Sequence, residues 1–161
     1  MSTKLSLITV SSSKDKWFDE AYEVYQSKIK KMISFDGINL KSSKMERDDS
    51  KLKIKKESEL ILNHIDKSDL VILFDERGKN LNSIEWAHLL DHEIQYSQKN
   101  IIFIIGGAFG VDDSIKKRAN KTLTLSPFVM NHKVACIVAM EQIYRALTII
   151  KKIPYHNDNT N

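Results

Sequence analysis

The sequence predicts an α/β fold in which a mostly parallel sheet is flanked by helices, within one domain spanning residues 1–161. Apolar runs of strand length alternate with amphipathic stretches along the whole chain. The runs at 69–75 and 100–107 are apolar almost throughout, which is typical of strands covered on both faces. No internal repeat or linker composition divides the chain, so we expect one domain rather than two.

The first half of the chain predicts two strands and two helices. "KLSLITV" at 4–10 is apolar and β-branched, and "SFDGINLK" at 34–41 is a second, shorter strand. Between them, apolar residues recur at steps of three and four and predict a helix over 14–32. The charged stretch 41–57 is expected to be a solvated loop leading into a helix that ends near Ile65.

The second half repeats the alternation three times. A strand over 69–75 is followed by a helix over 84–97, with Asn82 and Glu85 at the spacing of a capping box. A buried strand over 100–107 precedes a helix that Asp112 is placed to cap. A last strand over 121–126 precedes a long helix that opens at Asn131.

Composition limits the class of protein. A net charge of +4 and a pI near 9.0 are compatible with an anionic partner without requiring one. The single cysteine, Cys136, excludes an internal disulfide and a multi-cysteine metal site, and suits a reducing compartment. No apolar run has the length of a signal peptide or a membrane span, so we expect a cytoplasmic protein without a membrane partner.

Three strand ends carry the residues most suited to bind a ligand. In open α/β sheets, ligands bind at the carboxyl ends of parallel strands. These ends are Phe74–Gly78, the glycine turn Gly106–Gly110, and Leu125–Met130 with its apolar loop residues. The glycine spacing is not the dinucleotide G-x-G-x-x-G and no P-loop lysine is present. The three ends together favour a pocket with apolar walls for an adenosine-like group, although the glycines could equally serve tight packing.

Other polar residues are weaker candidates. His88 and His92 have a chelating spacing, but H-L-L-D-H is not the zinc motif H-E-x-x-H, and we expect no metal. Glu141 and Arg145 are spaced as a helix ion pair, and Cys136 is expected in the core. His156 lies so near the end of the chain that a disordered terminus is the simpler interpretation from position alone.

Several motifs together resemble one family along nearly the whole chain. "IIGGAFG", "EQIYRAL" and the ending "IPYH" stand in the order and spacing of the bacterial ribosomal large-subunit RNA methyltransferase H family, a branch of the SPOUT, or α/β-knot, methyltransferases. The short strand–helix opening and the Gly78-Lys79 pair also fit. The resemblance implies a C-terminal deep trefoil knot, an obligate homodimer, and no metal. It also implies methylation of N3 of a pseudouridine in 23S rRNA of the assembled ribosome.

The resemblance further implies S-adenosylmethionine as cofactor, bound among three knot loops. Carried over by position, the cofactor-binding residues are Phe74 and Asp75, then Gly106 and Gly107, then Leu125, Ser126, Pro127, Phe128, Val129 and Met130.

Methylation of N3 requires alignment of the methyl group of the cofactor with N3 and loss of the N3–H proton. The candidates are Arg145, His132, Tyr155 and His156. Our hypothesis is that Arg145 holds a phosphate or the base anion, while Tyr155 and His156 close over the site, either their own or that of the partner subunit. The chain departs from the family where Cys136 replaces a common arginine and Asn131 a common proline, and its tail is longer.

Two alternatives stay open at the level of sequence. One is a SPOUT methyltransferase that acts on another RNA, such as tRNA. The absence of an additional RNA-binding domain favours a structured ribosomal target instead. The other is a ribosome-associated RNA-binding factor without catalytic activity.

Overall fold

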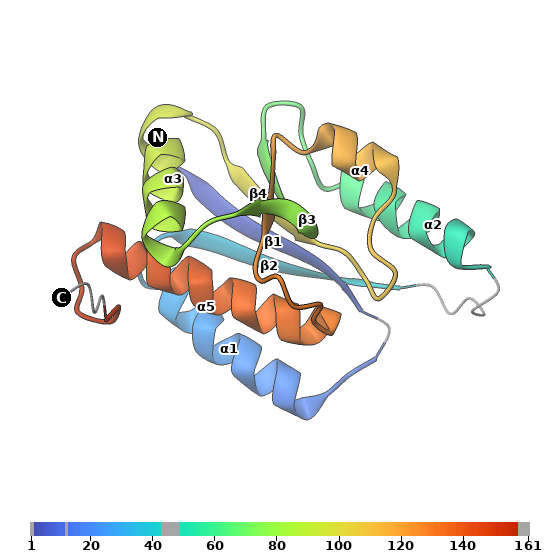
Figure 1. Cartoon of the computed structure of the whole chain (residues 1–161), viewed down its shortest axis with the longest axis horizontal. Coiled ribbons are helices and arrows are strands. Elements are labelled where there is room, and N and C mark those ends of the chain that lie inside the picture. The colour runs from blue at the N-terminus through green and yellow to red at the C-terminus, as the bar shows by residue number, and fades with distance from the viewer. Residues whose placement is uncertain (1, 12, 43–48, 158–161) are drawn as a thin grey trace.

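A five-stranded, all-parallel sheet forms the centre of the molecule (Figure 1). The computed structural model describes residues 2–11, 13–42 and 49–157. The strands lie in the order β2-β1-β4-β3-β5. Their bounds are β1 Lys4–Ser11, β2 Ser34–Lys41, β3 Leu70–Asn80, β4 Ile101–Ile105 and β5 Lys121–Thr124.

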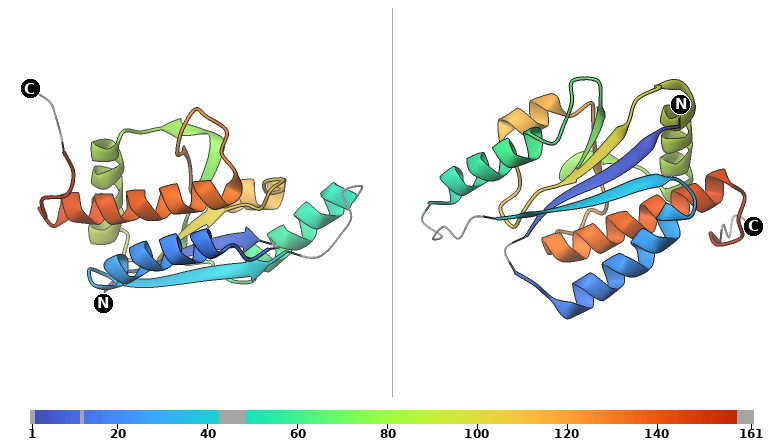
Figure 2. Two further views of the ribbon diagram at one scale, coloured as in Figure 1. Left: turned by 90° about the horizontal axis from the view of Figure 1, so that it is seen from below. Right: turned by 180° about the vertical axis from the view of Figure 1, so that it is seen from behind.

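Five helices cover both faces of this sheet. They are α1 Lys16–Lys30, α2 Ser50–Leu62, α3 Ser83–Tyr96, α4 Asp113–Arg118 and α5 His132–Ile150. Helix α5 packs against α1 and α3 on one face, whereas α2 and α4 lie side by side on the other (Figure 2). The predicted α/β architecture is therefore confirmed.

Alternation along the strands produces two apolar cores. Leu5 and Leu7 of β1 face the core under α1, α3 and α5, whereas Ile8 and Val10 face the core under α2 and α4. All five residues of β4 are buried, because β4 is the middle strand. This explains why the runs predicted as strands covered on both faces contain so few polar residues.

Two element boundaries differ most from the sequence prediction, whereas the others differ by at most three residues. Residues 50–57, predicted as loop, form the first two turns of α2, in which Lys51, Lys55 and Lys56 are exposed and Lys53 is partly buried. The predicted loop residues 43–48 lie outside the described residues. Strand β3 continues to Asn80 instead of ending at 75, because Lys79 and Asn80 pair with β5 after a bulge. A Cβ on Gly78 would come within 2.5 Å of the backbone of Leu123, so this close approach requires glycine.

The predicted helix starts are confirmed. Asn82 and Glu85 form a reciprocal capping box at α3. The side chains of Asp112 and Asn131 accept backbone hydrogen bonds at the starts of α4 and α5. The threading of the implied trefoil knot stays a prediction. Among the described residues, no helix combines the length and apolarity needed to cross a membrane.

Candidate active site

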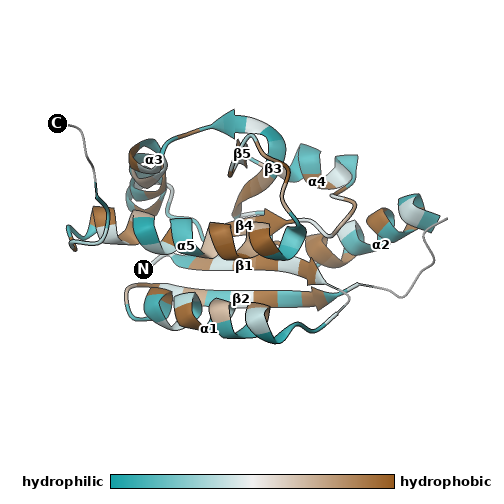
Figure 3. Ribbon diagram, turned by 60° about the horizontal axis from the view of Figure 1, so that its bottom comes forward, coloured by the Kyte–Doolittle hydropathy of each residue, from teal (hydrophilic) through white to brown (hydrophobic). Residues whose placement is uncertain are grey.

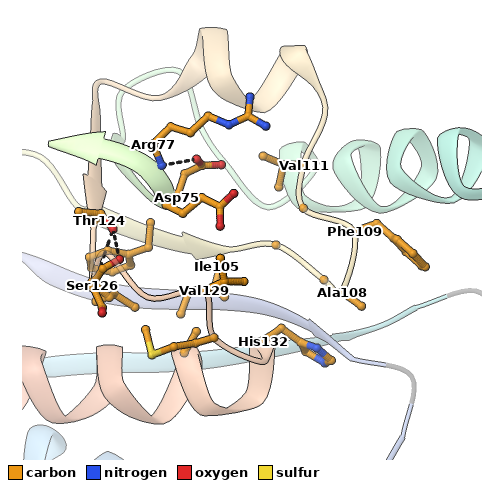
Figure 4. A pocket seen from close by; sticks show the side chains of 18 of the residues that line it. Asp75, Arg77, Ile105, Ala108, Phe109, Val111, Thr124, Ser126, Val129 and His132 are labelled. Atoms are coloured by element: carbon orange, nitrogen blue, oxygen red, sulfur yellow. Dashed lines mark hydrogen bonds between the residues drawn. The ribbon is translucent and has the colours of Figure 1, made fainter. Parts of the chain in front are cut away.

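The three predicted strand ends meet around one pocket of about 380 Å³ at the carboxyl edge of the sheet (Figure 4). Phe74 and Asp75 enter from β3, Gly106 and Gly107 follow β4, and the loop after β5 closes a third side. Helix α5 begins at the pocket with His132. Of the residues predicted to bind cofactor, the pocket is lined by Phe74, Asp75, Gly106, Gly107, Leu125, Ser126, Phe128, Val129 and Met130. Pro127 belongs to the same loop but does not line the pocket.

The glycine turn is a tight reversal of the chain. The N–H of Gly110 donates to the carbonyl of Gly107 at 3.0 Å, and Gly110 has a φ of 83°, in the left-handed region that favours glycine. A Cβ on Gly106 would lie 2.9 Å from the backbone carbon of Gly110 and from Cγ1 of Val111. A side chain at Gly106 is therefore incompatible with this turn, which presents bare backbone to the pocket.

The loop after β5 exposes apolar side chains beside the pocket. Thr124 donates its hydroxyl to the carbonyl of Ser126 at 2.7 Å, and the Ser126 hydroxyl accepts from the N–H of Phe128 at 2.9 Å. These local bonds stabilise a turn that holds Phe128 and Val129 outward, with 82% and 80% of their surfaces exposed. Exposed apolar groups of this size are typical of ligand-binding sites and of protein–protein interfaces.

Charged groups of both signs line the pocket. The Asp75 carboxylate accepts the backbone N–H of Arg77 at 2.9 Å, which fixes the turn after the first half of β3. Glu76 and the cations Arg77 and Lys116 also line the pocket. Asp75 and Arg77 are drawn on the same wall in Figure 4. The pocket can thus bind a ligand that carries positive and negative groups on an apolar skeleton.

His132 stands at the start of α5, on the side of the pocket where Ala108 and Phe109 lie (Figure 4). Partial burial and the positive charge of Lys133 lower the pKa of His132, and Lys53 adds to this effect. Glu57 and Asp15 oppose the shift. A lowered pKa keeps the imidazole neutral at pH 7, so one ring nitrogen is free to accept a proton.

Lys133, which the sequence analysis did not single out, anchors the start of α5. Only 4% of its surface is exposed, and its ammonium donates to the carbonyl of Ser13 at 2.9 Å and to the Ser13 hydroxyl at 3.0 Å. It also forms an ion pair with Asp15. These contacts tie the pocket end of α5 to the loop after β1. In the sequence, Lys133 is one of many lysines, and only the tertiary structure distinguishes it.

The other predicted catalytic residues form a cluster at the far end of α5, hereafter the C-terminal cluster of Glu141, Arg145, Tyr155 and His156. Glu141 accepts from Nε of Arg145 at 3.0 Å and from the Tyr155 hydroxyl at 3.1 Å. Arg145 donates from Nη1 to Nδ1 of His156 at 3.1 Å and lies over the Tyr155 ring. Hydrogen bonding to Glu141 raises the pKa of Arg145, which stays cationic.

The structure separates the four predicted catalytic residues into two groups. Along the axis of α5, His132 and Arg145 are about 20 Å apart, at a rise of 1.5 Å per residue. The structure therefore does not bring Arg145, Tyr155 and His156 to the pocket of their own chain. It does hold His156 in a defined contact rather than leaving it without partners, contrary to the simpler interpretation from its position.

Cys136 and the Glu141–Arg145 pair lie in the environments that the sequence predicts. Cys136 is buried in the core, where burial raises the pKa of its thiol to about 12, and Glu141 and Arg145 form the predicted ion pair. Within the described residues, no group of three or more His, Cys, Asp or Glu side chains is placed to hold a metal ion. The sequence analysis did not identify Glu57, which is buried beneath Gly107. It lies in a charged stretch that indicated only a solvated loop.

Comparison with known proteins identifies the family. Residues 3–156 match a family described as predicted SPOUT methyltransferase. Ribosomal RNA large subunit methyltransferase H of Bdellovibrio bacteriovorus is 49% identical over 154 residues, which cover 96% of this chain and 99% of the relative. The enzyme of the same name from Caldicellulosiruptor saccharolyticus is 38% identical over 157 residues, covering 94% and 99%.

Solved structures agree at the level of the fold. A probable methylase family protein from Haemophilus influenzae superposes with a TM-score of 0.53 at 15% identity, over 97% of this chain and 72% of that one. A probable rRNA-methyltransferase from Porphyromonas gingivalis gives 0.52 at 12% identity, over 92% and 70%. With a matching family that spans almost the whole chain and relatives of full length, this protein belongs to the SPOUT methyltransferases, in the ribosomal RNA large subunit methyltransferase H family.

Proposed function

We propose that the protein transfers a methyl group from S-adenosylmethionine to N3 of a pseudouridine in the 23S rRNA of the assembled ribosome. The observation that carries this proposal is the pocket in which three strand-end loops converge on the start of α5. Family membership supports RNA methylation as the reaction class, and the names of the relatives support ribosomal RNA as the substrate.

The residues of the pocket fit S-adenosylmethionine. Phe74, Leu125 and Met130 supply apolar surface for an adenine ring, and the side-chain-free backbone at Gly106 allows close approach of a ribose. The carboxylate of Asp75 suits ribose hydroxyls or a positive centre. Arg77 and Lys116 suit the carboxylate of the methionine portion. The cofactor has no phosphate, which explains why the glycine turn lacks the dinucleotide spacing.

The cofactor supplies an activated methyl group on a sulfonium centre, so the protein has to position the base and remove one proton. As the N3–CH₃ bond forms, the S–CH₃ bond of the donor would break and leave a neutral thioether, and the N3–H proton would pass to an acceptor. His132 is the candidate acceptor within the pocket, because its pKa is lowered and its imidazole is neutral at pH 7. Arg145 suits stabilisation of the negative charge that develops on the base.

We infer a homodimer in which the C-terminal cluster of one subunit completes the pocket of the other. Exposed apolar side chains accompany α5 from the pocket toward the tail: Phe128, Val129, Val134 and Ile153. Hydrophobic residues recur along this helix (Figure 3). Two-fold symmetric pairing along antiparallel α5 helices would bury them and bring Arg145 of one chain toward His132 of its partner.

Two measurements test the proposed function. Purified protein is expected to transfer labelled methyl groups from S-adenosylmethionine to ribosomes isolated from cells that lack it. Mass spectrometry is expected to show that the 23S rRNA of cells without the protein lacks one methyl group. Transfer to tRNA instead of ribosomes would identify the alternative RNA substrate. For the binding-factor alternative, S-adenosylmethionine at 100 times its Kd would stabilise a true binder by about 2.7 kcal/mol, whereas a non-binder shows no thermal shift.

A further inference from the structure

Helix α2 carries a concentration of positive charge beside the pocket. It has four lysines, Lys51, Lys53, Lys55 and Lys56, against the two acids Glu57 and Glu59. Glu57 is buried, so its charge is directed inward rather than toward solvent. Among the described residues, none of these lysines forms a salt bridge, in contrast to Lys4, Lys121 and Lys133.

An exposed aromatic ring lies next to these lysines. Phe109, at the tip of the glycine turn, is 47% exposed, and the ammonium of Lys53 lies 5.6 Å from the centre of its ring. Phe109 also lines the rim of the pocket, and in Figure 4 its ring points away from the pocket centre. Lys56 follows Lys53 by three residues, so the two share one side of the helix. Lys53 is also close enough to His132 to lower its pKa.

The contacts beneath the glycine turn fix α2 relative to the pocket. The Ser58 hydroxyl accepts the backbone N–H of Asp112 at 3.1 Å, which joins α2 to the start of α4. A Cβ on Gly107 would lie 2.8 Å from Oε2 of Glu57, so the turn rests directly on the buried carboxylate. Lys53 and Phe109 are therefore held at a defined position on the rim and are not carried by independent loops.

We propose that Lys53, Lys56 and Phe109 form an RNA-binding surface that guides the target nucleotide into the pocket; this inference rests on the proposed function. Unpaired ammonium groups suit RNA phosphates, and an exposed aromatic ring next to a cation suits stacking on an unpaired base. RNA is read mainly through unstacked bases and backbone, which this combination contacts. The exposed Phe128 and Val129, for which the described part of the chain shows no cation contact, belong to the proposed subunit interface.

The test compares variants of the full-length protein in methyl transfer to ribosomes from cells that lack it, at saturating S-adenosylmethionine. Lys53→Gln and Lys56→Gln are each expected to raise the KM for ribosomes and to reduce the slope of log affinity against log salt by about 1. Phe109→Ala removes a stacking surface and is expected to weaken ribosome affinity by about 5- to 150-fold. For Lys53→Gln, the affinity for S-adenosylmethionine stays unchanged.

Matched controls lie at the opposite edge of the sheet. Lys99→Gln removes an exposed lysine before β4, and Tyr96→Ala removes a ring that is 69% exposed at the end of α3. Neither control is expected to change ribosome affinity. The surface proposal is overturned if the α2 and Phe109 variants methylate ribosomes like wild type, or if Phe109→Ala acts by dissociating the dimer in light scattering. Failure of the wild-type protein itself to methylate would instead reject the proposed function.

Discussion

At the scale of single residues, the pocket depends on the missing side chain of Gly106 and on the neutral imidazole of His132. Gly106 leaves room for the backbone of Gly110, and the neutral imidazole of His132 leaves a nitrogen able to accept a proton. The room at Gly106 comes from its residue type, because glycine has no Cβ, whereas the lowered pKa of His132 comes from its surroundings. Substitution and pH therefore test them separately.

Gly106→Ala is expected to open the glycine turn, because its Cβ would approach the backbone carbon of Gly110 to 2.9 Å. Overpacking of this kind costs about 1–3 kcal/mol. We expect lower stability in urea unfolding and weaker S-adenosylmethionine binding by calorimetry. Gly110→Ala is the control: no atom lies within 4 Å of its added Cβ, and its cost of about 1 kcal/mol comes from the positive φ alone. Equal ligand affinity in Gly106→Ala and wild type would contradict this role.

His132 is expected to make stability depend on pH in a defined direction. Its folded-state pKa is lower than the unfolded value near 6.5, so the unfolded chain binds more protons between the two pKa values. The free energy of unfolding should therefore fall as the pH falls from about 6.5 to the lower folded-state pKa. In His132→Gln this part of the pH dependence should disappear, as measured by urea unfolding at several pH values. An unchanged pH dependence in the variant would assign the effect to other groups.

At the scale of elements, α5 connects two chemically distinct ends. Lys133 fixes its start to the loop after β1, and Glu141 holds Arg145 and the tail near its end. Between them, Cys136, Ala139, Met140 and Ile143 belong to the core, so the helix is a rigid spacer of about 20 Å between His132 and Arg145.

Removal of residues 154–161 is expected to abolish methyl transfer while leaving the fold, the dimer and S-adenosylmethionine binding intact. Tyr155 contacts the protein mainly through the Tyr144 ring, Glu141 and Arg145, and it contributes little to the buried core. His156→Ala should show the same separation of effects. Circular dichroism, light scattering and calorimetry serve as controls on the truncated chain. Full activity after truncation would exclude the tail from the reaction.

At the scale of the whole molecule, the proposed dimer makes each site depend on two chains. This predicts complementation between a pocket variant, His132→Ala, and a cluster variant, Arg145→Ala, each inactive alone. Random exchange of the two chains gives half mixed dimers, each with one intact site, and thus about one quarter of wild-type activity. The rate of methyl transfer after mixing and subunit exchange measures this. No recovery in dimers shown to be mixed would place both residues at the site of a single chain.

Local chemistry made several features predictable from sequence alone. Alternation of apolar runs and amphipathic stretches determined the α/β class, and Asn82, Asp112 and Asn131 marked helix starts because capping involves only neighbouring residues. The strand ends at Phe74, Gly106 and Leu125 could be grouped because carboxyl ends of parallel strands share one edge. The resemblance to a known family then predicted that these strand ends bind a cofactor.

Only the tertiary structure decided which distant residues meet. The extension of β3 to Asn80 depends on hydrogen bonds to β5, and the burial of Glu57 and Lys133 depends on partners more than 40 residues away in sequence. The division of the predicted catalytic residues between the two ends of α5 depends on the length and direction of that helix. The sequence by itself determined the helices, strands and caps, because these depend on residue types and periodicities within short stretches of chain. Tertiary structure determined distances, because these arise from packing between elements that the periodicity of each element does not encode.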